Sequence, residues 1–131
     1  MDKVIHRESN AWGRTSTVIL AGGFAFVMVT VLDREKDVAV IHDLVVHESM
    51  RKKGLGTKLL NEAMKEAMNM GAEMIILSVE PVSWLVTWYF KHGFVLNRRE
   101  EYDGHDFFVL EKRRRDASEP QATESAISNV D

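Results

Sequence analysis

The sequence predicts an α+β fold of the α/β-sandwich type, in which helices flank a mixed, mainly antiparallel, twisted sheet. Two observations support this prediction. Residues 15–47 hold successive runs rich in Val, Ile and Phe, separated by short breaks, as in an antiparallel meander. From residue 56 onward the apolar spacing changes to that of a helix, and a strand, a second helix and a hairpin follow.

The first half of the chain is expected to be built from strands. These strands are expected over residues 4–6, 15–21, 24–32 and 38–47. Gly22 and Gly23 interrupt the β pattern after the second run, and the polar residues 33–37 form a turn after the third.

The second half begins with an amphipathic helix over residues 56–70, which Gly71 ends. Its apolar face consists of Leu59, Leu60, Ala63, Ala67 and Met70. Residues 72–79 form a continuous apolar run, which is typical of a strand covered on both faces. Pro81 ends that strand.

A second helix is expected from Ser83, as its cap, to about His92, with Gly93 as its stop. Strands over residues 94–102 and 106–111 follow, and the Asp103-Gly104 pair between them predicts a hairpin turn.

Length and composition restrict the class of protein. The chain has 131 residues, which fits one domain over residues 1–112, followed by a polar tail over 113–131 that we expect to be disordered. The formal net charge of −3 argues against a general affinity for nucleic acid or an anionic membrane. The absence of cysteine excludes disulfides and thiolate chemistry and fits a cytoplasmic location.

The most informative segment runs from Val45 to Thr57. A Val-rich strand ends there, a basic turn follows, and Gly54 and Gly56 lead into the first helix. Free N–H groups and the positive end of the dipole at a helix N-terminus suit a diphosphate. Neither the P-loop pattern nor the dinucleotide pattern fits, since the latter needs a glycine where Leu59 stands. A simple turn with solvated lysines is the alternative, and the surrounding strand and helix make it less favoured.

Three motifs in the right order resemble the GCN5-related N-acetyltransferase (GNAT) family. The segment from Arg51 to Gly56 is similar to that family's [RQ]-x-x-G-x-[GA] signature. Residues 41–46 resemble its fourth strand, and residues 89–94 resemble its Y-x-x-x-G-F motif. The resemblance covers residues 15–112. It implies the GNAT-like fold, with acetyl-CoA as co-substrate and no metal.

The resemblance also implies roles for individual residues. The backbone of Val45 and Val46 would pair with the pantetheine arm of coenzyme A, and Tyr89 would protonate the departing thiolate. The diphosphate would be bound by the backbone N–H groups of Arg51, Lys52, Lys53, Gly54, Leu55, Gly56 and Thr57. The implied activity is transfer of an acetyl group to a primary amine, either a small molecule or a protein N-terminus or lysine, by direct attack in a ternary complex.

Such a reaction needs a base, because on the order of one in a thousand amines with a pKa of about 10.4 is neutral at pH 7. Asp43 ranks first because it lies on the strand where the family often has a carboxylate. Glu80 ranks second, at the end of the next strand. His42 and His47 are further candidates, since histidine titrates near neutral pH. For each of the four, a surface polar group without a catalytic role is the alternative.

The chain departs from the family pattern in two places. The pair of helices that normally follows the first strand is reduced, absent or replaced by residues 7–14, so the acceptor site is expected to be open or completed by a second subunit. Exposed strands after Phe94 make a homodimer a reasonable expectation. The family's asparagine near the start of the last helix is replaced by residues 82–84. Trp84 and Trp88 are candidates to line the cleft, with core packing as the alternative.

Two other functions compete with this interpretation. A non-catalytic acyl-CoA-binding or interaction module could retain the loop and have lost turnover. A nucleic-acid or partner-binding protein could use the basic residues 112–115, although such clusters are usually only solvated.

Overall fold

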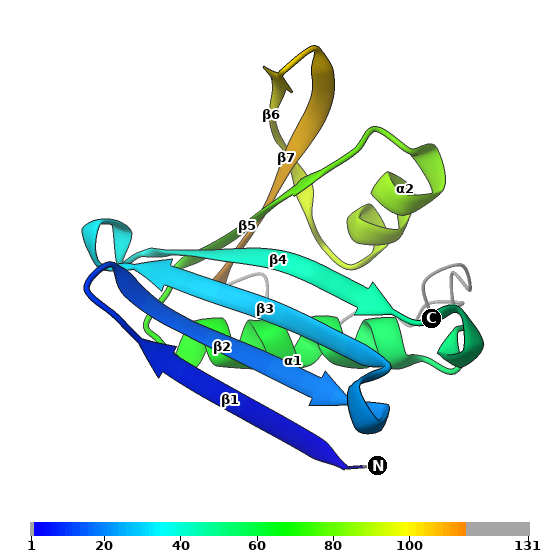
Figure 1. The fold of residues 1–131 in the computed structure, drawn as a ribbon. Coiled ribbons are helices and arrows are strands. Elements are labelled where there is room, and N and C mark those ends of the chain that lie inside the picture. The colour runs from blue at the N-terminus through cyan, green and yellow to red at the C-terminus, as the bar shows by residue number, and fades with distance from the viewer. Residues whose placement is uncertain (1, 115–131) are drawn as a thin grey trace.

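The structure, a computed structural model, describes residues 2–114 of the chain. Within that range seven strands form one sheet in the order β1-β2-β3-β4-β5-β7-β6 (Figure 1). The strands are β1 (Lys3–Ser9), β2 (Gly13–Leu20), β3 (Ala25–Leu32), β4 (Val38–Val46), β5 (Met74–Val79), β6 (Val95–Tyr102) and β7 (His105–Arg113). The helices are α1 (Leu55–Asn69) and α2 (Ser83–Lys91), and three short 3-10 turns lie at Ala21–Gly23, Asp33–Glu35 and Glu48–Met50.

The pairing of the strands confirms the predicted mixed, mainly antiparallel sheet. Neighbouring strands are antiparallel everywhere except between β4 and β5, which run parallel. The parallel pairing is short and joins residues 38–40 of β4 to residues 74–76 of β5. Beyond Val40 the two strands are no longer paired, so the sheet opens toward the carboxyl ends of both strands.

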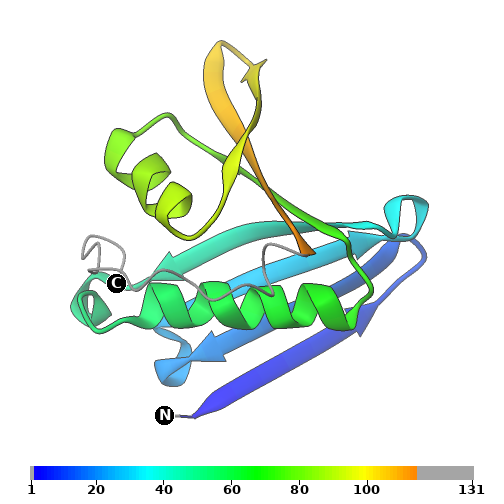
Figure 2. The same ribbon diagram turned by 180° about the vertical axis from the view of Figure 1, so that it is seen from behind.

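Both described helices pack against the same face of the sheet. Helix α1 lies across β2, β3 and β4 (Figure 2). Ala39 of β4 pairs with Ile75 of β5, which pairs with Lys112 of β7, and all three side chains are buried on that face. The Lys112 ammonium donates to the backbone carbonyl of His92, directly after α2, at 2.7 Å. The end of α2 therefore covers the same face as α1.

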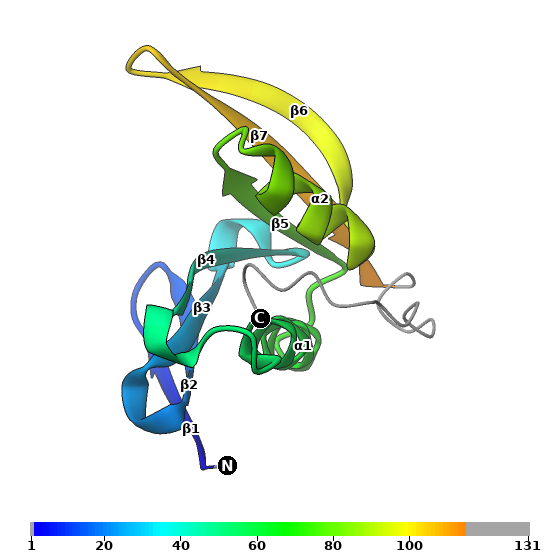
Figure 3. The same ribbon diagram turned by 90° about the vertical axis from the view of Figure 1, so that its right-hand side faces the viewer.

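The opposite face of the sheet carries no helix within residues 2–114. Figure 3 views the β1–β4 half nearly edge-on and shows α1 on one side of it only. The two helices that the family places after its first strand are absent from this part of the chain, because Asn10–Trp12 join β1 directly to β2. The Asn10 side chain accepts hydrogen bonds from the backbone N–H groups of Trp12 and Gly13 and thereby forms this tight turn.

Several predictions of local structure were wrong. Strand β1 spans seven residues instead of three, because Lys3 and Arg7, which face α1 beside Ile5, are charged and hide the alternating β pattern. Ser83 makes no capping hydrogen bond; the residue before the helix is Val82. Lys112 is only 2% exposed, so it is not part of a solvated basic cluster. Strand β5 is covered on one face only, since Met74 and Ile76 remain partly exposed. The predicted disordered tail over 113–131 starts at Arg113, the last residue of β7, and from residue 115 onward it lies outside the described residues.

Candidate active site

A β-bulge in β4 organises the site. Phe26 of β3 pairs with Val45 and Met28 pairs with His42, so β4 holds one residue more than β3 over this stretch. Asp43 takes up the difference with a left-handed backbone angle φ of 59°. Side chains of a regular strand alternate, so Ile41 and Val46 would point to opposite faces. With the extra residue, both are buried.

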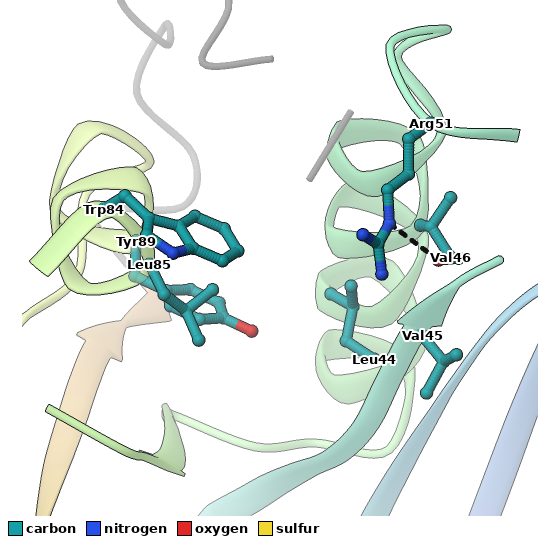
Figure 4. Close-up of a pocket in the computed structure, with 7 residues that line it drawn as sticks. All are labelled: Leu44, Val45, Val46, Arg51, Trp84, Leu85 and Tyr89. Atoms are coloured by element: carbon teal, nitrogen blue, oxygen red, sulfur yellow. Dashed lines mark hydrogen bonds between the residues drawn. The ribbon is translucent and has the colours of Figure 1, made fainter. Parts of the chain in front are cut away.

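Beyond the bulge, the end of β4 and the helix α2 enclose a cavity of about 290 Å³ (Figure 4). Its walls are Leu44, Val45, Val46, Arg51, Trp84, Leu85 and Tyr89. This cavity opens where β4 and β5 have ceased to pair. It brings together five of the residues predicted from sequence, namely two valines of β4, the first residue of the signature, and Trp84 and the tyrosine of α2.

Arg51 reaches into this cavity from the loop after β4. Its Nε donates to the carbonyl oxygen of Val46 at 3.2 Å, so the guanidinium lies along the strand end (Figure 4). Arg51 therefore adds a positive charge at the point where the strand backbone passes into the loop.

Tyr89 lies on the other wall, with its hydroxyl directed from α2 toward β4 (Figure 4). The residue is 7% exposed, and its ring packs edge-on against Trp88 and Phe94. Burial raises the pKa of the Tyr89 phenol to about 12. The phenol is therefore protonated throughout the physiological range and can act as a proton donor.

The loop between β4 and α1 has the geometry expected of an anion site. Lys52 and Gly54 both adopt left-handed angles, with φ of 64° and 77°, and Gly54 precedes the first residue of α1. Lys52 and Lys53 are exposed, whereas Leu55 and Gly56 are buried in the first helical turn. The first N–H groups of the helix thus face the loop beside exposed ammonium groups.

Thr57, the last residue assigned to the loop, contacts the residue that follows the second helix. Its hydroxyl lies 3.2 Å from Nε2 of His92, whose Nδ1 lies 2.8 Å from the carbonyl oxygen of Trp88. The start of α1 and the end of α2 are fixed to each other by these contacts. His92 had no assigned role from sequence beyond marking the helix end.

The two predicted carboxylate bases lie outside the cavity. Asp43 is in the bulge, with its side chain 63% exposed and 3.7 Å from Nδ1 of His42. Glu80 follows β5 and lines a second cavity of about 480 Å³ near the β6–β7 turn, whose other walls are Pro81, Gly104, His105, Asp106 and Phe107. His47, the fourth candidate, instead caps the 3-10 turn after β4, where its Nδ1 accepts from the Ser49 backbone N–H at 3.1 Å.

Sequence reasoning missed part of the cavity wall. Leu44 lies within the strand motif over residues 41–46 but was given no role there, and Leu85 lies in no motif. The two tryptophans of α2 take different roles: Trp84 lines the cavity and is 43% exposed, whereas Trp88 is fully buried in the core. Helical spacing could not separate these roles, because both faces of α2 are apolar.

The described residues hold neither a candidate metal site nor a membrane-spanning helix. In the described part of the chain, no group of three His, Cys, Asp or Glu side chains is arranged to hold a metal ion. None of the helices between residues 2 and 114 combines the length and the apolar character needed to cross a membrane.

Several solved structures with a similar architecture are acetyltransferases. A GNAT family acetyltransferase from Elizabethkingia anophelis, with acetyl-CoA bound, superposes with a TM-score of 0.65 at 12% identity, over 85% of this chain and 97% of that one. A Bacillus subtilis acetyltransferase in complex with CoA gives a TM-score of 0.63 at 18% identity, over 86% of this chain and 99% of that one. A GNAT family acetyltransferase from Streptococcus pneumoniae gives a TM-score of 0.63 at 26% identity, over 80% of this chain and 68% of that one.

The sequence itself gives a direct assignment. No curated protein sequence matches the chain significantly. The family model for the acetyltransferase (GNAT) family matches residues 20–94, which is more than half of the chain and includes the bulged strand, the loop and α2. The chain therefore belongs to the acetyltransferase (GNAT) family, a family of acyltransferases.

Proposed function

We propose that the protein transfers an acetyl group from acetyl-CoA to a primary amine by direct attack in a ternary complex. The observation that carries this proposal is the cavity between the end of β4 and α2, which joins the signature loop to the buried phenol of Tyr89. Acetyl-CoA or CoA is present in two of the similar solved structures.

The donor would lie along β4 and the loop. The pantetheine arm fits the cavity lined by Val45 and Val46, where the unpaired strand edge offers backbone groups for its amides. The diphosphate would lie on the loop from Arg51 to Thr57, against the N-terminus of α1. A strand N–H near Val45 would stabilise the negative charge that develops on the thioester oxygen.

Proton transfers would occur at both ends of the reaction. Tyr89, held neutral by its raised pKa, would donate its proton to the thiolate of coenzyme A as the C–S bond breaks. On the acceptor side Asp43 and Glu80 are the carboxylates that could receive a proton from the ammonium or attract it. The acceptor amine is a small molecule or a protein N-terminus or lysine.

The test is calorimetry with acetyl-CoA and with CoA, followed by free-thiol release with a panel of spermidine, glucosamine and a short peptide with a free N-terminus. Binding of both nucleotides and thiol release with at least one amine support the proposal. Folded protein that binds neither acetyl-CoA nor CoA would rule it out.

A non-catalytic acyl-CoA-binding module is the second candidate, favoured by the missing helices over the acceptor side of the sheet. Binding of acetyl-CoA without thiol release for any amine would support that candidate.

The proposal also includes a cytoplasmic location and a homodimer. The edge strand β6 is exposed along its whole length, and such an edge can pair with a second chain. Sedimentation analysis tests the dimer.

A further inference from the structure

The face of the sheet without helices carries a hydrogen-bonded row of side chains that crosses three strands. The hydroxyl oxygens of Thr15 on β2 and Thr30 on β3 lie 2.8 Å apart. The Thr30 hydroxyl lies 2.8 Å from Nε2 of His42 on β4. The row ends beside the bulge, where Nδ1 of His42 lies 3.7 Å from a carboxylate oxygen of Asp43.

The bulge separates this row from the proposed donor site. Up to Ile41, the buried side chains of β4 face the helices, so His42 faces the opposite side. After the bulge, Leu44 and Val46 return to the helix side and line the cavity proposed for acetyl-CoA. The strand that would hold the thioester therefore presents His42 and Asp43 on the other side of the sheet, where an amine can approach without crossing the donor.

The two ring nitrogens of His42 have different surroundings. Nε2 is within hydrogen-bond distance of Thr30. Nδ1 is 3.7 Å from a carboxylate oxygen of Asp43, which is too long for a hydrogen bond, and the carboxylate attracts this nitrogen once the ring is protonated. When Nε2–H donates to Thr30 and Thr30 donates to Thr15, Nδ1 keeps its lone pair. The side chain of His42 is 39% exposed, so the imidazole ring is partly open to solvent.

We propose that His42 is the catalytic base, with Nδ1 as the proton acceptor, Thr30 and Thr15 as positioning residues, and Asp43 stabilising the resulting imidazolium. This inference rests on the proposed acetyl transfer. It reassigns Asp43 from base to partner, because the Asp43 carboxylate lies 3.7 Å from Nδ1 of His42, where its negative charge can stabilise the imidazolium.

Two residues, His42 and Tyr89, carry all the proton transfers of the reaction. The N–H bond of the ammonium breaks, its electron pair stays on nitrogen, and the proton binds Nδ1 of His42. The neutral amine then attacks the thioester carbon. As the C–S bond breaks, sulfur takes the electron pair of that bond and accepts the proton of Tyr89. The attacking nitrogen then gives a second proton to the Tyr89 phenolate, which becomes a phenol again. The imidazolium releases its proton to solvent.

The charged surroundings of His42 are simple. From β2 and β3 it faces hydroxyls, those of Thr15 and Thr30. From β4 it faces the carboxylate of Asp43. Glu80 follows β5 on the other side of the opening between the strands and is the alternative base to be tested.

The first experiment compares kcat/KM between pH 6 and 10 for the wild type, His42→Gln and Glu80→Gln with an amine that the wild type acetylates. We expect His42→Gln to lower the rate about 100-fold at pH 7, with an unchanged Kd for acetyl-CoA. The deficit should shrink toward pH 10, where the amine loses its proton without help. A deficit that is equal at every pH, or a larger loss in Glu80→Gln, would overturn the assignment.

The positioning residues and the tautomer are tested separately. Thr30→Val should lower kcat about 10-fold and Thr30→Ser should restore it, because serine keeps the hydroxyl. Long-range ¹H–¹⁵N NMR spectra of the folded protein should show that neutral His42 carries its proton on Nε2. This measurement does not depend on the choice of amine. Protonation on Nδ1 would overturn the proposal. A wild type that neither binds acetyl-CoA nor releases thiol overturns the acetyl transfer and this inference together, whereas normal turnover by His42→Gln overturns this inference alone.

Discussion

Arg7 holds Glu66 through two parallel hydrogen bonds, from Nε and Nη2 to the two carboxylate oxygens, each 3.0 Å long. This pair joins the first strand to the central helix, and Lys3 with Glu62 repeats the contact one turn earlier at 3.1 Å. The Glu66 side chain is 5% exposed. The bonds from Arg7 hold the pKa of the Glu66 carboxyl below its usual range, although burial acts in the opposite direction.

The lowered pKa makes the stability of the protein depend on pH. A carboxyl with a lowered folded-state pKa stabilises the fold above its unfolded pKa, and this contribution is lost as pH falls through the folded pKa. We expect Glu66→Gln to lower the melting temperature by several degrees at pH 7 and by much less in acid. Thermal unfolding by circular dichroism checks this, with Glu73→Gln, an exposed carboxylate 4.0 Å from Arg114, as the matched control. Equal losses at both pH values would contradict the prediction.

Tyr89→Phe tests the proton donor. Phenylalanine keeps the packing against Trp88 and Phe94 and removes only the hydroxyl. We expect kcat for thiol release to fall about 100-fold with an unchanged Kd for acetyl-CoA. Because the pKa of Tyr89 is raised to about 12, the wild type should lose no activity through its ionisation below about pH 11. Tyr102→Phe, at an exposed tyrosine of the hairpin, is the control and should behave as the wild type.

Gly54 and Gly71 form a matched pair for the loop. Both have left-handed angles, φ of 77° and 88°, and a Cβ at either would meet nothing within 4 Å. Alanine at each should therefore destabilise the protein by a similar amount, roughly 1–2 kcal/mol from backbone strain alone. Only Gly54→Ala should also weaken acetyl-CoA binding, because Gly71 follows the far end of α1. Urea unfolding and calorimetry measure the two effects, and equal affinities would argue against the loop as the diphosphate site.

Arg51→Gln probes the charge at the strand end. The substitution keeps a donor for the Val46 carbonyl and removes the cation beside the proposed diphosphate. We expect acetyl-CoA binding to weaken about 10-fold, and the loss to shrink in high salt, which screens the charge in the wild type. Arg98→Gln is the control, because Arg98 lies on the hairpin and pairs with Glu100 at 2.9 Å. Calorimetry at two salt concentrations gives the comparison.

Much of the fold follows from local sequence signals. The Val-rich runs, the helical spacing after Gly54 and the Asp103-Gly104 turn each correspond to an observed element. The signature located Arg51 and the Y-x-x-x-G-F motif located Tyr89, and the fold brings the two residues to one cavity. These signals are short-range, and the residues that carry them are close in sequence.

What could not be predicted depends on pairing between distant segments. The bulge at Asp43 arises from the register of β4 against β3, and no residue type in His42-Asp43-Leu44 marks it. The burial of Lys112 depends on its contact with the carbonyl of His92, twenty positions away. The absence of helices from one face follows from a three-residue turn after β1, whereas the sequence indicated only that the usual helices are reduced, absent or replaced by residues 7–14.

The bulge also bears on how the reaction would end. Under the proposed function, coenzyme A would depart past α2 while the acetylated amine would depart from the bare face near His42. Separate exits mean that neither product has to wait for the other. An acceptor too bulky for an enclosed pocket, such as the end of a folded polypeptide, could therefore be modified and let go without any opening of the fold.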